Sequence, residues 1–319
     1  MKKVLIIGAG KIGKHLWHRL LAGSHDVSFI HRNTAGDPRS EIARTKPDAV
    51  FLAISTLDNG EAALSYITTC LKLGIPVITC EKGALAYHAD KLIPHLDQIG
   101  WSATVGGGTM LGPYLRGRNP RNQKVAISAV LNATLNFIFD EVRRGGRTLG
   151  EACVEAMRLG YAEPGSNGPL DLIHGEIEDV ERKACVLFNT CIAKDMFMKP
   201  EGFIKFNQES LEKMSGNAAN YRMLVHLSNY PVESTMLFEG AFGIEIDGWN
   251  ISGGFEILDG NHERFSWLPG GVGNAIQIVE GDLGAGGKFR LEGPGAGAEA
   301  TTGAMLNDFE RLMETHTRN

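Results

Sequence analysis

The fold is decided by Lys3-Val4-Leu5-Ile6-Ile7-Gly8-Ala9-Gly10-Lys11-Ile12-Gly13. An apolar run predicts a short buried strand, and a helical pattern follows it. Between them lies G-x-G-x-x-G. Its first glycine permits a tight turn, its second lets backbone approach a pyrophosphate, and its third lets the helix pack on the strand. Free amides at the helix N-terminus favour phosphate. The stretch therefore predicts a dinucleotide site at Gly8, Gly10, Lys11, Ile12 and Gly13.

Short apolar runs alternate with helical patterns through the first hundred residues. This order predicts an α/β fold with a Rossmann-like, doubly wound parallel sheet. The expected strands are 4–7, 27–30, 49–54 and 76–80. The expected helices are 11–21, 60–73 and 89–98.

The pattern changes near residue 124, which predicts a second domain. We expect a dinucleotide-binding domain over 1–125, completed by 290–319, and a second α/β domain with a mixed sheet over 126–289. A loop is expected from 161 to 175, because that segment is rich in proline and glycine. The further strands are expected at 125–131, 234–245, 253–259 and 274–280, and the further helices at 135–142, 149–159, 177–195 and 298–314.

Composition excludes several classes of protein. The chain has 319 residues and a net charge of -5, with no basic tract, so no nucleic-acid partner is expected. No apolar stretch is long enough to span a membrane, and the run that ends at Ile7 is too short for a signal peptide. Five cysteines without a C-x-x-C pair indicate a reducing, cytoplasmic location.

The end of the second strand bears on the choice of nucleotide. NAD-specific sites usually place a carboxylate there, whereas this chain has His31-Arg32-Asn33-Thr34. Arg32 can pair with a 2′-phosphate, which favours NADP, with NAD as the alternative. The competing interpretation is a solvated arginine in a loop.

A second group of charged residues lies at 179–183. Asp179 and Lys183 are four residues apart, so they share one face of a helix. An apolar run follows Lys183 directly, and the desolvation this implies favours the neutral, proton-accepting amine. A surface ion pair, of the kind expected for Glu178 and Arg182, is an equally good explanation from these residues alone.

At this point the chain resembles the homoserine dehydrogenases. Their G-Y-x-E-P motif, following Asp-Leu and D-x-x-x-K helix match Gly160–Pro164, Asp171-Leu172 and Asp179–Lys183. Further segments match in the family's order along nearly the whole chain. These are Thr79–Ala86, Ala103–Gly108, Val130–Ile138, Asn274-Ala275-Ile276 and Gly293–Gly297.

The resemblance implies NAD(P)-dependent interconversion of L-homoserine and L-aspartate 4-semialdehyde, in threonine and methionine biosynthesis. Oxidising the alcohol needs a proton acceptor, while the cofactor takes the hydride. The family's two lysines match Lys82 and Lys183. We assign Lys183 as the general base or acid, held by Asp179, and Lys82 as the group that positions the reacting oxygen. The two lysine roles can be exchanged.

The resemblance also implies substrate contacts from Glu163, Asp171, Tyr161 and Thr134. Glu163 would bind the substrate ammonium. Structural roles compete with this interpretation: Tyr161 as a core aromatic, and Asp171 and Thr134 as helix N-caps. The further expected cofactor contacts are Ser55, Thr56, Lys82, Gly108, Gly295 and Gly297.

The resemblance also implies a bound cation and an oligomeric state. The family binds a monovalent cation through backbone carbonyls, which would lie near Ser102, Val105 and Gly107 and would be sodium. A homodimer is expected through the sheet of the second domain. Because the chain ends soon after Gly297, it resembles a short form without a C-terminal regulatory domain, and no threonine feedback is expected.

Several residues depart from the family pattern. Glu81 replaces an asparagine and would keep Lys82 charged, while Ser102 replaces a frequent glutamate. Ala129, Ala133 and the pair Thr109-Met110 alter positions that bear on substrate choice. Two alternatives therefore stay open: a related NADP-dependent dehydrogenase of another small amino-acid alcohol or aldehyde, and a non-catalytic NADP-binding regulator.

Overall fold

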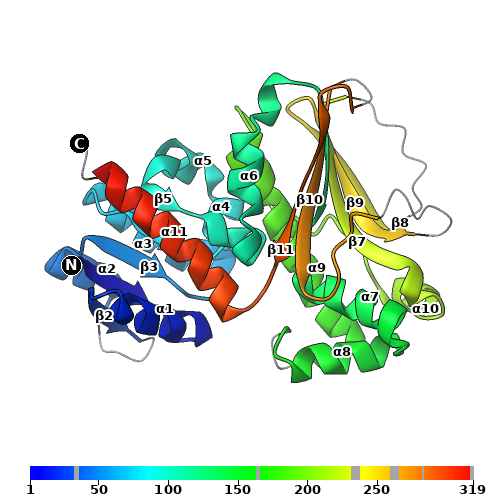
Figure 1. Cartoon of the computed structure of the whole chain (residues 1–319), viewed down its shortest axis with the longest axis horizontal. Coiled ribbons are helices and arrows are strands. Elements are labelled where there is room, and N and C mark those ends of the chain that lie inside the picture. Colours follow the sequence, from blue (N-terminus) through cyan, green and yellow to red (C-terminus); the bar gives the residue numbers. More distant parts are fainter. Residues whose placement is uncertain (32–35, 163–165, 231–237, 259–265, 282–283, 317–319) are drawn as a thin grey trace. The chain divides into compact units, whose positions relative to one another are not determined.

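The structure is a computed structural model that describes residues 1–31, 36–162, 166–230, 238–258, 266–281 and 284–316. The chain divides into two compact units (Figure 1). Unit 1 comprises Met1–Met110 and Gly297–Asn319, and unit 2 comprises Leu111–Ala296. Residues 111–125 and 290–296 thus belong to unit 2 rather than to the first domain. The reason is that the helix at Leu111–Gly117 packs in unit 2 and the strand at Gly287–Pro294 pairs there.

Unit 1 is built on a parallel sheet, as expected. Its strand order is β2-β1-β3-β4-β5, and every described pairing is parallel. The strands are β1 (Lys3–Ile7), β2 (Asp26–Ile30), β3 (Ala49–Leu52), β4 (Val77–Thr79) and β5 (Ile99–Gly100). The helices are α1 (Lys11–Ala22), α2 (Pro38–Thr45), α3 (Glu61–Lys72), α4 (Gly83–Tyr87), α5 (Ala89–Leu92) and α11 (Ala298–His316).

Two helices of unit 1 were not expected from the sequence. The Asp37 side chain caps α2, and Pro38 occupies the first helical position, where its missing N–H costs nothing. Helix α4 begins at Gly83, after a short segment that follows β4. The expected helix 89–98 is divided, because α5 gives way to a 3₁₀ segment, Ile93–Gln98, that begins next to Pro94. The other 3₁₀ turns are Asp58–Gly60, Ser102–Thr104, Gly107–Thr109, Pro120–Asn122 and Ala218–Asn220.

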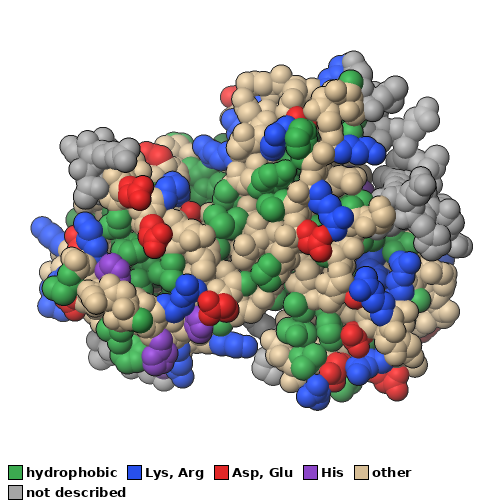
Figure 2. Space-filling model, in the orientation of Figure 1, with side chains coloured by type: hydrophobic (Ala, Val, Ile, Leu, Met, Phe, Trp, Pro, Cys, Tyr) green, Lys and Arg blue, Asp and Glu red, His purple; other side chains and the backbone are tan. Residues whose placement is uncertain are grey.

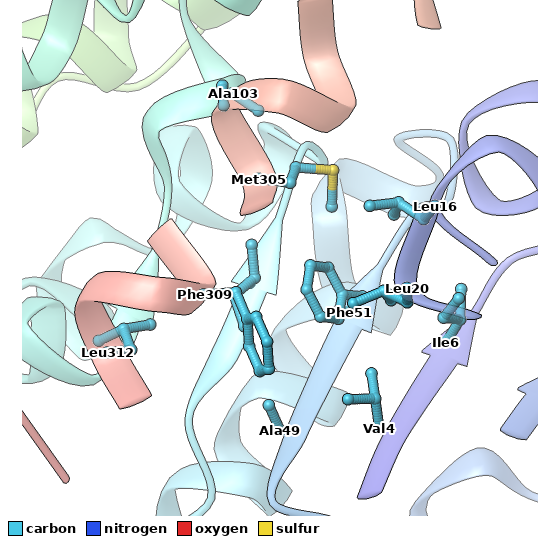
Figure 3. Packing of buried hydrophobic residues seen from close by; sticks show 12 residues of the cluster. Val4, Ile6, Leu16, Leu20, Ala49, Phe51, Ala103, Met305, Phe309 and Leu312 are labelled. Atoms are coloured by element: carbon cyan, nitrogen blue, oxygen red, sulfur yellow. The ribbon is translucent and has the colours of Figure 1, made fainter. Parts of the chain in front are cut away.

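The core of unit 1 joins the two ends of the chain. Leu16 and Leu20 from α1 and Met305 and Phe309 from α11 pack against the same face of the sheet (Figure 3). The rings of Phe51 and Phe309 lie 5.4 Å apart between centroids. The last helix, α11, is therefore part of the core of unit 1.

Unit 2 contains a six-stranded sheet of order β11-β10-β6-β7-β9-β8. Every described pairing in it is antiparallel, so the expected mixed sheet is corrected. One physical reason is the Asp247-Gly248 turn, in which both residues have positive φ, as a tight hairpin requires. The strands are β6 (Val125–Val130), β7 (Tyr221–Ser228), β8 (Phe238–Ile246), β9 (Trp249–Ile257), β10 (Gly273–Glu280) and β11 (Gly287–Pro294).

The helices of unit 2 are α6 (Leu111–Gly117), α7 (Ala133–Gly145), α8 (Leu149–Arg158), α9 (Pro169–Cys191) and α10 (Gln208–Ser215). The loop expected over 161–175 is wrong in its second half. Helix α9 begins at Pro169, because proline at the first helical position is tolerated and Gly168 supplies the extended entry. Strands β7 and β11, which were not expected, complete the sheet.

None of the five cysteines forms a disulfide. Burial raises the pKa of Cys70 and Cys153 to about 12 and that of Cys80 and Cys191 to about 11, so these thiols are poor nucleophiles. The described helices include none that is long and apolar enough to cross a membrane. On the face drawn in Figure 2, Lys and Arg side chains are interspersed with Asp and Glu.

Two glycines of the first turn allow a matched test of the fold. A Cβ on Gly13 would lie 1.8 Å from the Gly8 carbonyl oxygen, whereas a Cβ on Gly10 meets nothing within 4 Å. We expect Gly13→Ala to destabilise the protein by about 1–3 kcal/mol or more, since backbone must move. Gly10→Ala should change stability by less than about 0.5 kcal/mol. Urea unfolding compares them, and equal midpoints would contradict the packing role of Gly13.

Candidate active site

The glycine turn of unit 1 has the geometry of a phosphate cradle. Gly8 has φ +115°, and a Cβ there would lie 2.2 Å from the Ala53 carbonyl oxygen, so only glycine fits. Gly10 caps α1 and is exposed, and no described side chain caps the amides of that helix. Exposed backbone and uncapped amides at a helix N-terminus suit an anionic phosphate. The residues present therefore fit a dinucleotide.

The carboxyl ends of β3 and β4 bring Thr56 and Glu81 together. Glu81 is 1% exposed, and its carboxylate accepts from the Thr56 hydroxyl and the Gly83 amide, each at 2.5 Å. It also accepts from the Ala84 amide at 3.0 Å. Glu81 thus ties the loop after β3 to the first turn of α4, which begins next to Lys82. Cofactors bind at this edge of open α/β sheets.

The remaining expected cofactor residues differ in how exposed and how closely packed they are. Lys11 and Ser55 are exposed, and Gly108 packs so closely on Ala300 that a Cβ would lie 2.8 Å from the alanine Cβ. Gly297 has φ +106° and open space, so its backbone is accessible. Gly295 belongs to unit 2, where it packs against Asn274 and Ala133. Arg32, Asn33 and Thr34 lie outside the described residues.

In unit 2, Asp179 and Lys183 form the predicted pair on α9. The Lys183 Nζ lies 2.7 Å from Asp179 Oδ2, and the side chains are 11% and 14% exposed. The neighbouring Arg182–Glu178 pair is longer, at 3.4 Å, and its carboxylate is 70% exposed. Desolvation makes the buried pair costly unless further hydrogen bonds support it. A surface ion pair therefore describes Arg182 and Glu178 and not Lys183 and Asp179.

Asn132 supplies that support, and the sequence did not single it out as a site residue. Its Oδ1 accepts from the Leu135 amide at 2.7 Å and caps α7. Its Nδ2 donates to Asp179 Oδ2 at 3.0 Å and to Glu176 Oε2 at 2.6 Å. One amide thereby joins the start of α7 to two carboxylates of α9. An asparagine shortly before the helix expected at 135–142 was the available signal, but its partners on α9 are distant in sequence.

Thr134 and Tyr161 lie together near the start of α7. The Thr134 hydroxyl donates to the Tyr161 carbonyl at 2.8 Å, and the Tyr161 ring meets Phe137 edge-on at 4.9 Å. Asn132 is the N-cap of α7, so the alternative role of Thr134 as a cap is wrong. Tyr161 is half-buried, which leaves part of it accessible.

Asp171 is exposed in the first turn of α9 and accepts from the Asn167 amide at 3.2 Å. The N-cap of that helix is Gly168, so Asp171 is not the cap itself. Eight residues separate it from Asp179, about 12 Å along the helix axis. Glu163 lies outside the described residues.

The expected cation segment is tightly packed in unit 1. The amide and hydroxyl of Ser102 both donate to Asp308 on α11, at 2.8 and 2.7 Å. Across the described ranges, no cluster of three or more His, Cys, Asp or Glu residues is arranged to hold a metal. A cation held by backbone carbonyls near Val105 and Gly107 stays a prediction.

The family model that matches this chain and two of its sequence relatives are described as homoserine dehydrogenases. A family model described as homoserine dehydrogenase matches residues 114–309. The chain is 26% identical over 340 residues to the homoserine dehydrogenase of Pseudomonas aeruginosa, covering 99% of this chain and 73% of that protein. It is 25% identical over 282 residues to the NAD(+)-dependent homoserine dehydrogenase of Pseudomonas canavaninivorans, covering 85% of this chain and 72% of that protein.

Solved structures share the fold. A hyperthermophilic archaeal homoserine dehydrogenase in complex with NADPH matches with a TM-score of 0.71 and 22% identity, over 99% of this chain and 98% of that one. The homoserine dehydrogenase of Thiobacillus denitrificans gives the same TM-score and identity, over 99% and 74% of the two chains.

Asn132 can be tested against Asn207, which caps α10 by accepting from the amide and the hydroxyl of Ser210. Each Asn→Ala change should cost about 1–2 kcal/mol for the lost cap. Each Asn→Asp change keeps the cap oxygen, but the carboxylate that N132D introduces would face Glu176 and Asp179. We therefore expect N207D to be neutral and N132D to be destabilised at pH 7, with recovery on acidification as carboxylates become neutral. Urea unfolding at pH 7 and pH 5 measures this; equal behaviour of the two Asn→Asp variants would refute the bridging role.

Proposed function

The chain belongs to the homoserine dehydrogenase family, and from this premise we propose that it interconverts L-homoserine and L-aspartate 4-semialdehyde with NADP. The observation that carries the proposal is the buried Asp179–Lys183 pair. It lies within the family match and has the shielding and support that a proton-transfer group needs. The glycine turn of unit 1 fits the nucleotide.

We assign the proton transfer to Lys183. In oxidation, the substrate hydroxyl loses its proton and its carbon loses a hydride, which the nicotinamide of NADP+ accepts when bound. In the reverse direction, the Lys183 ammonium donates a hydrogen bond and then a proton to the aldehyde oxygen. Asp179 lies 2.7 Å from the Lys183 Nζ and holds it in place, an arrangement that suits a proton-transfer group. Lys82 would position the reacting oxygen, or exchange roles with Lys183.

The substrate contacts are proposed from the family motif and from position. Thr134 lies at the start of α7, close in the chain to Asn132, which contacts Asp179, and its hydroxyl donates to the Tyr161 carbonyl. Glu163 would bind the substrate ammonium, and Asp171, on an exposed turn of α9, would contribute a second carboxylate. Glu81 would fix Thr56 and the backbone next to Lys82.

NADP is proposed over NAD because Arg32, with Asn33 and Thr34, replaces a carboxylate at the end of β2. One relative is named as NAD(+)-dependent and one structural neighbour is a complex with NADPH, so the family uses both nucleotides. A cytoplasmic homodimer with a role in threonine and methionine biosynthesis, and with a backbone-bound monovalent cation, completes the proposal.

A non-catalytic NADP-binding regulator is the second candidate. Such a protein needs the glycine turn but has no use for a desolvated lysine paired with a carboxylate. Breaking a buried pair by removing one partner costs several kcal/mol, and a hydrophobic replacement is often neutral. The buried pair, kept together with Asn132 as its support, therefore favours the enzyme.

Lys183→Met tests the reaction. We expect turnover with L-homoserine and NADP+ to fall by about 10²–10⁴-fold, since methionine fills the site but transfers no proton. Glu178→Gln, on the same helix but 70% exposed, is the matched control and should keep full turnover. The measurement is the appearance of NADPH absorbance, with nucleotide binding as a check on folding. Normal turnover in K183M would overturn the assignment, and a wild-type protein that binds NADP+ but does not turn over would favour the regulator.

Arg32→Ala tests the choice of cofactor. If Arg32 pairs with the 2′-phosphate, its loss should weaken NADP+ binding by about tenfold or more, as expected for a charge-assisted hydrogen bond, and leave NAD+ binding nearly unchanged. Gly10→Ala should weaken both nucleotides, because its methyl group occupies the space at the pyrophosphate. Calorimetric titration of each variant with NADP+ and with NAD+ measures these affinities. An equal effect of R32A on both nucleotides would contradict the proposed preference.

A further inference from the structure

Unit 2 contains a small polar cavity that the proposed reaction does not use. Its volume is about 190 Å³. It lies beyond the middle of α7, towards the end of that helix opposite to Asn132. The lining residues are Asp140, Arg143, Arg144, Arg222, Leu258, Ser266, Leu268 and Pro269.

The described residues that line the cavity carry more positive than negative charge. Among the described residues that line it, three are arginines and Asp140 alone is acidic. Asp140 Oδ1 lies 3.0 Å from both Arg222 Nη2 and Arg144 Nε. Arg143 is exposed and has no ion-pair partner in the described part of the chain. One carboxylate thus serves two guanidinium groups, and a third group lies beside them.

Arg222 is the deepest of these groups. It is 3% exposed, its Nη1 donates to the Tyr221 carbonyl at 2.8 Å, and its Nε is buried with no hydrogen-bond partner in the described structure. Burial, with Arg143 and Arg144 nearby, lowers its pKa to about 10. A buried donor without a partner is costly and calls for an explanation such as an unseen ligand or water.

The cavity wall is held in place from α7. Asn136 donates to the carbonyls of Pro269 and Gly271 at 3.0 and 2.9 Å, and Asp140 accepts from the Gly271 amide at 2.8 Å. A Cβ on Gly270 would lie 2.9 Å from Arg144 Nη1, so the absence of a side chain there leaves room for the guanidinium. The arginines therefore surround a preformed space.

The helix dipole of α7 explains two of the three arginines that line the cavity. Arg143 and Arg144 lie in the last turn of α7, where cations interact favourably with the helix dipole. That explanation does not extend to Arg222, which comes from β7 and has its unpaired Nε in the interior.

We propose that this cavity binds a compact oxyanion, phosphate or the phosphoryl group of a small phosphomonoester. Arginine presents several N–H donors in a planar fork that matches phosphate oxygens. An oxyanion here would offset the positive charge of the described lining residues and accept hydrogen bonds from their guanidinium groups. The cavity is large enough for such an ion together with water.

Calorimetric titration with inorganic phosphate tests the proposal on the full chain, at constant ionic strength with chloride as the reference. We expect saturable binding that Arg143→Gln weakens about tenfold, as for one lost charge-assisted hydrogen bond. Arg158→Gln, in an exposed ion pair on α8, is the control with the same change in charge and should bind like wild type. Both variants retain the glycine turn, so phosphate bound there contributes equally to both.

Arg222→Lys provides a second test, because it keeps a cation for Asp140 but removes Nε and the fork. It should fold, as judged by urea unfolding, and bind phosphate more weakly. A parallel titration with glycerol 3-phosphate shows whether a phosphomonoester is also accepted. The proposal fails if phosphate binding does not saturate in the wild type. It also fails if R143Q and R158Q bind phosphate equally.

Discussion

The hydrogen bonds of Asn132 are the constraint on which the candidate active site depends. A lysine and an aspartate that are each less than 15% exposed need additional partners, because their mutual attraction alone does not offset desolvation. The Asn132 amide nitrogen donates to Asp179 while its oxygen caps α7. One side chain therefore links the start of α7 to the Asp179–Lys183 pair.

Further polar side chains on α7 also hydrogen-bond to neighbouring segments. Asn132, Asn136, Asp140 and Arg144 recur at every fourth position and so lie on one face of the helix. Asn136 and Asp140 satisfy the backbone of 269–271, and Asp140 pairs with Arg222. In the described part of the chain, Asn136 Oδ1 and the Nε of Arg222, the β7 residue that pairs with Asp140, have no hydrogen-bond partner. A phosphate in the adjacent cavity would offset the charge of the arginines at this end of the helix.

Unit 1 follows a different constraint, the close approach of backbone segments. Gly8 and Gly13 leave no space for a side chain, whereas Gly10 does, so the turn is packed on two sides and open on the third. Glu81 adds a buried carboxylate that fixes the next loop through Thr56 and the start of α4. Close backbone packing thus shapes the glycine turn of unit 1, whereas hydrogen bonds of polar side chains support the Asp179–Lys183 pair of unit 2.

The sequence by itself determined the parallel sheet, the glycine turn and the Asp179–Lys183 pair, because each depends on residues that are close in the chain. Local pattern also identified the family, through motifs in order. Only the tertiary structure decided the antiparallel sheet, the early start of α9 at Pro169 and the role of Asn132, whose partners on α9 lie more than forty residues away. The cavity at Arg222 likewise joins α7, β7 and the 266–269 segment, and no local pattern predicts which distant charges will come together.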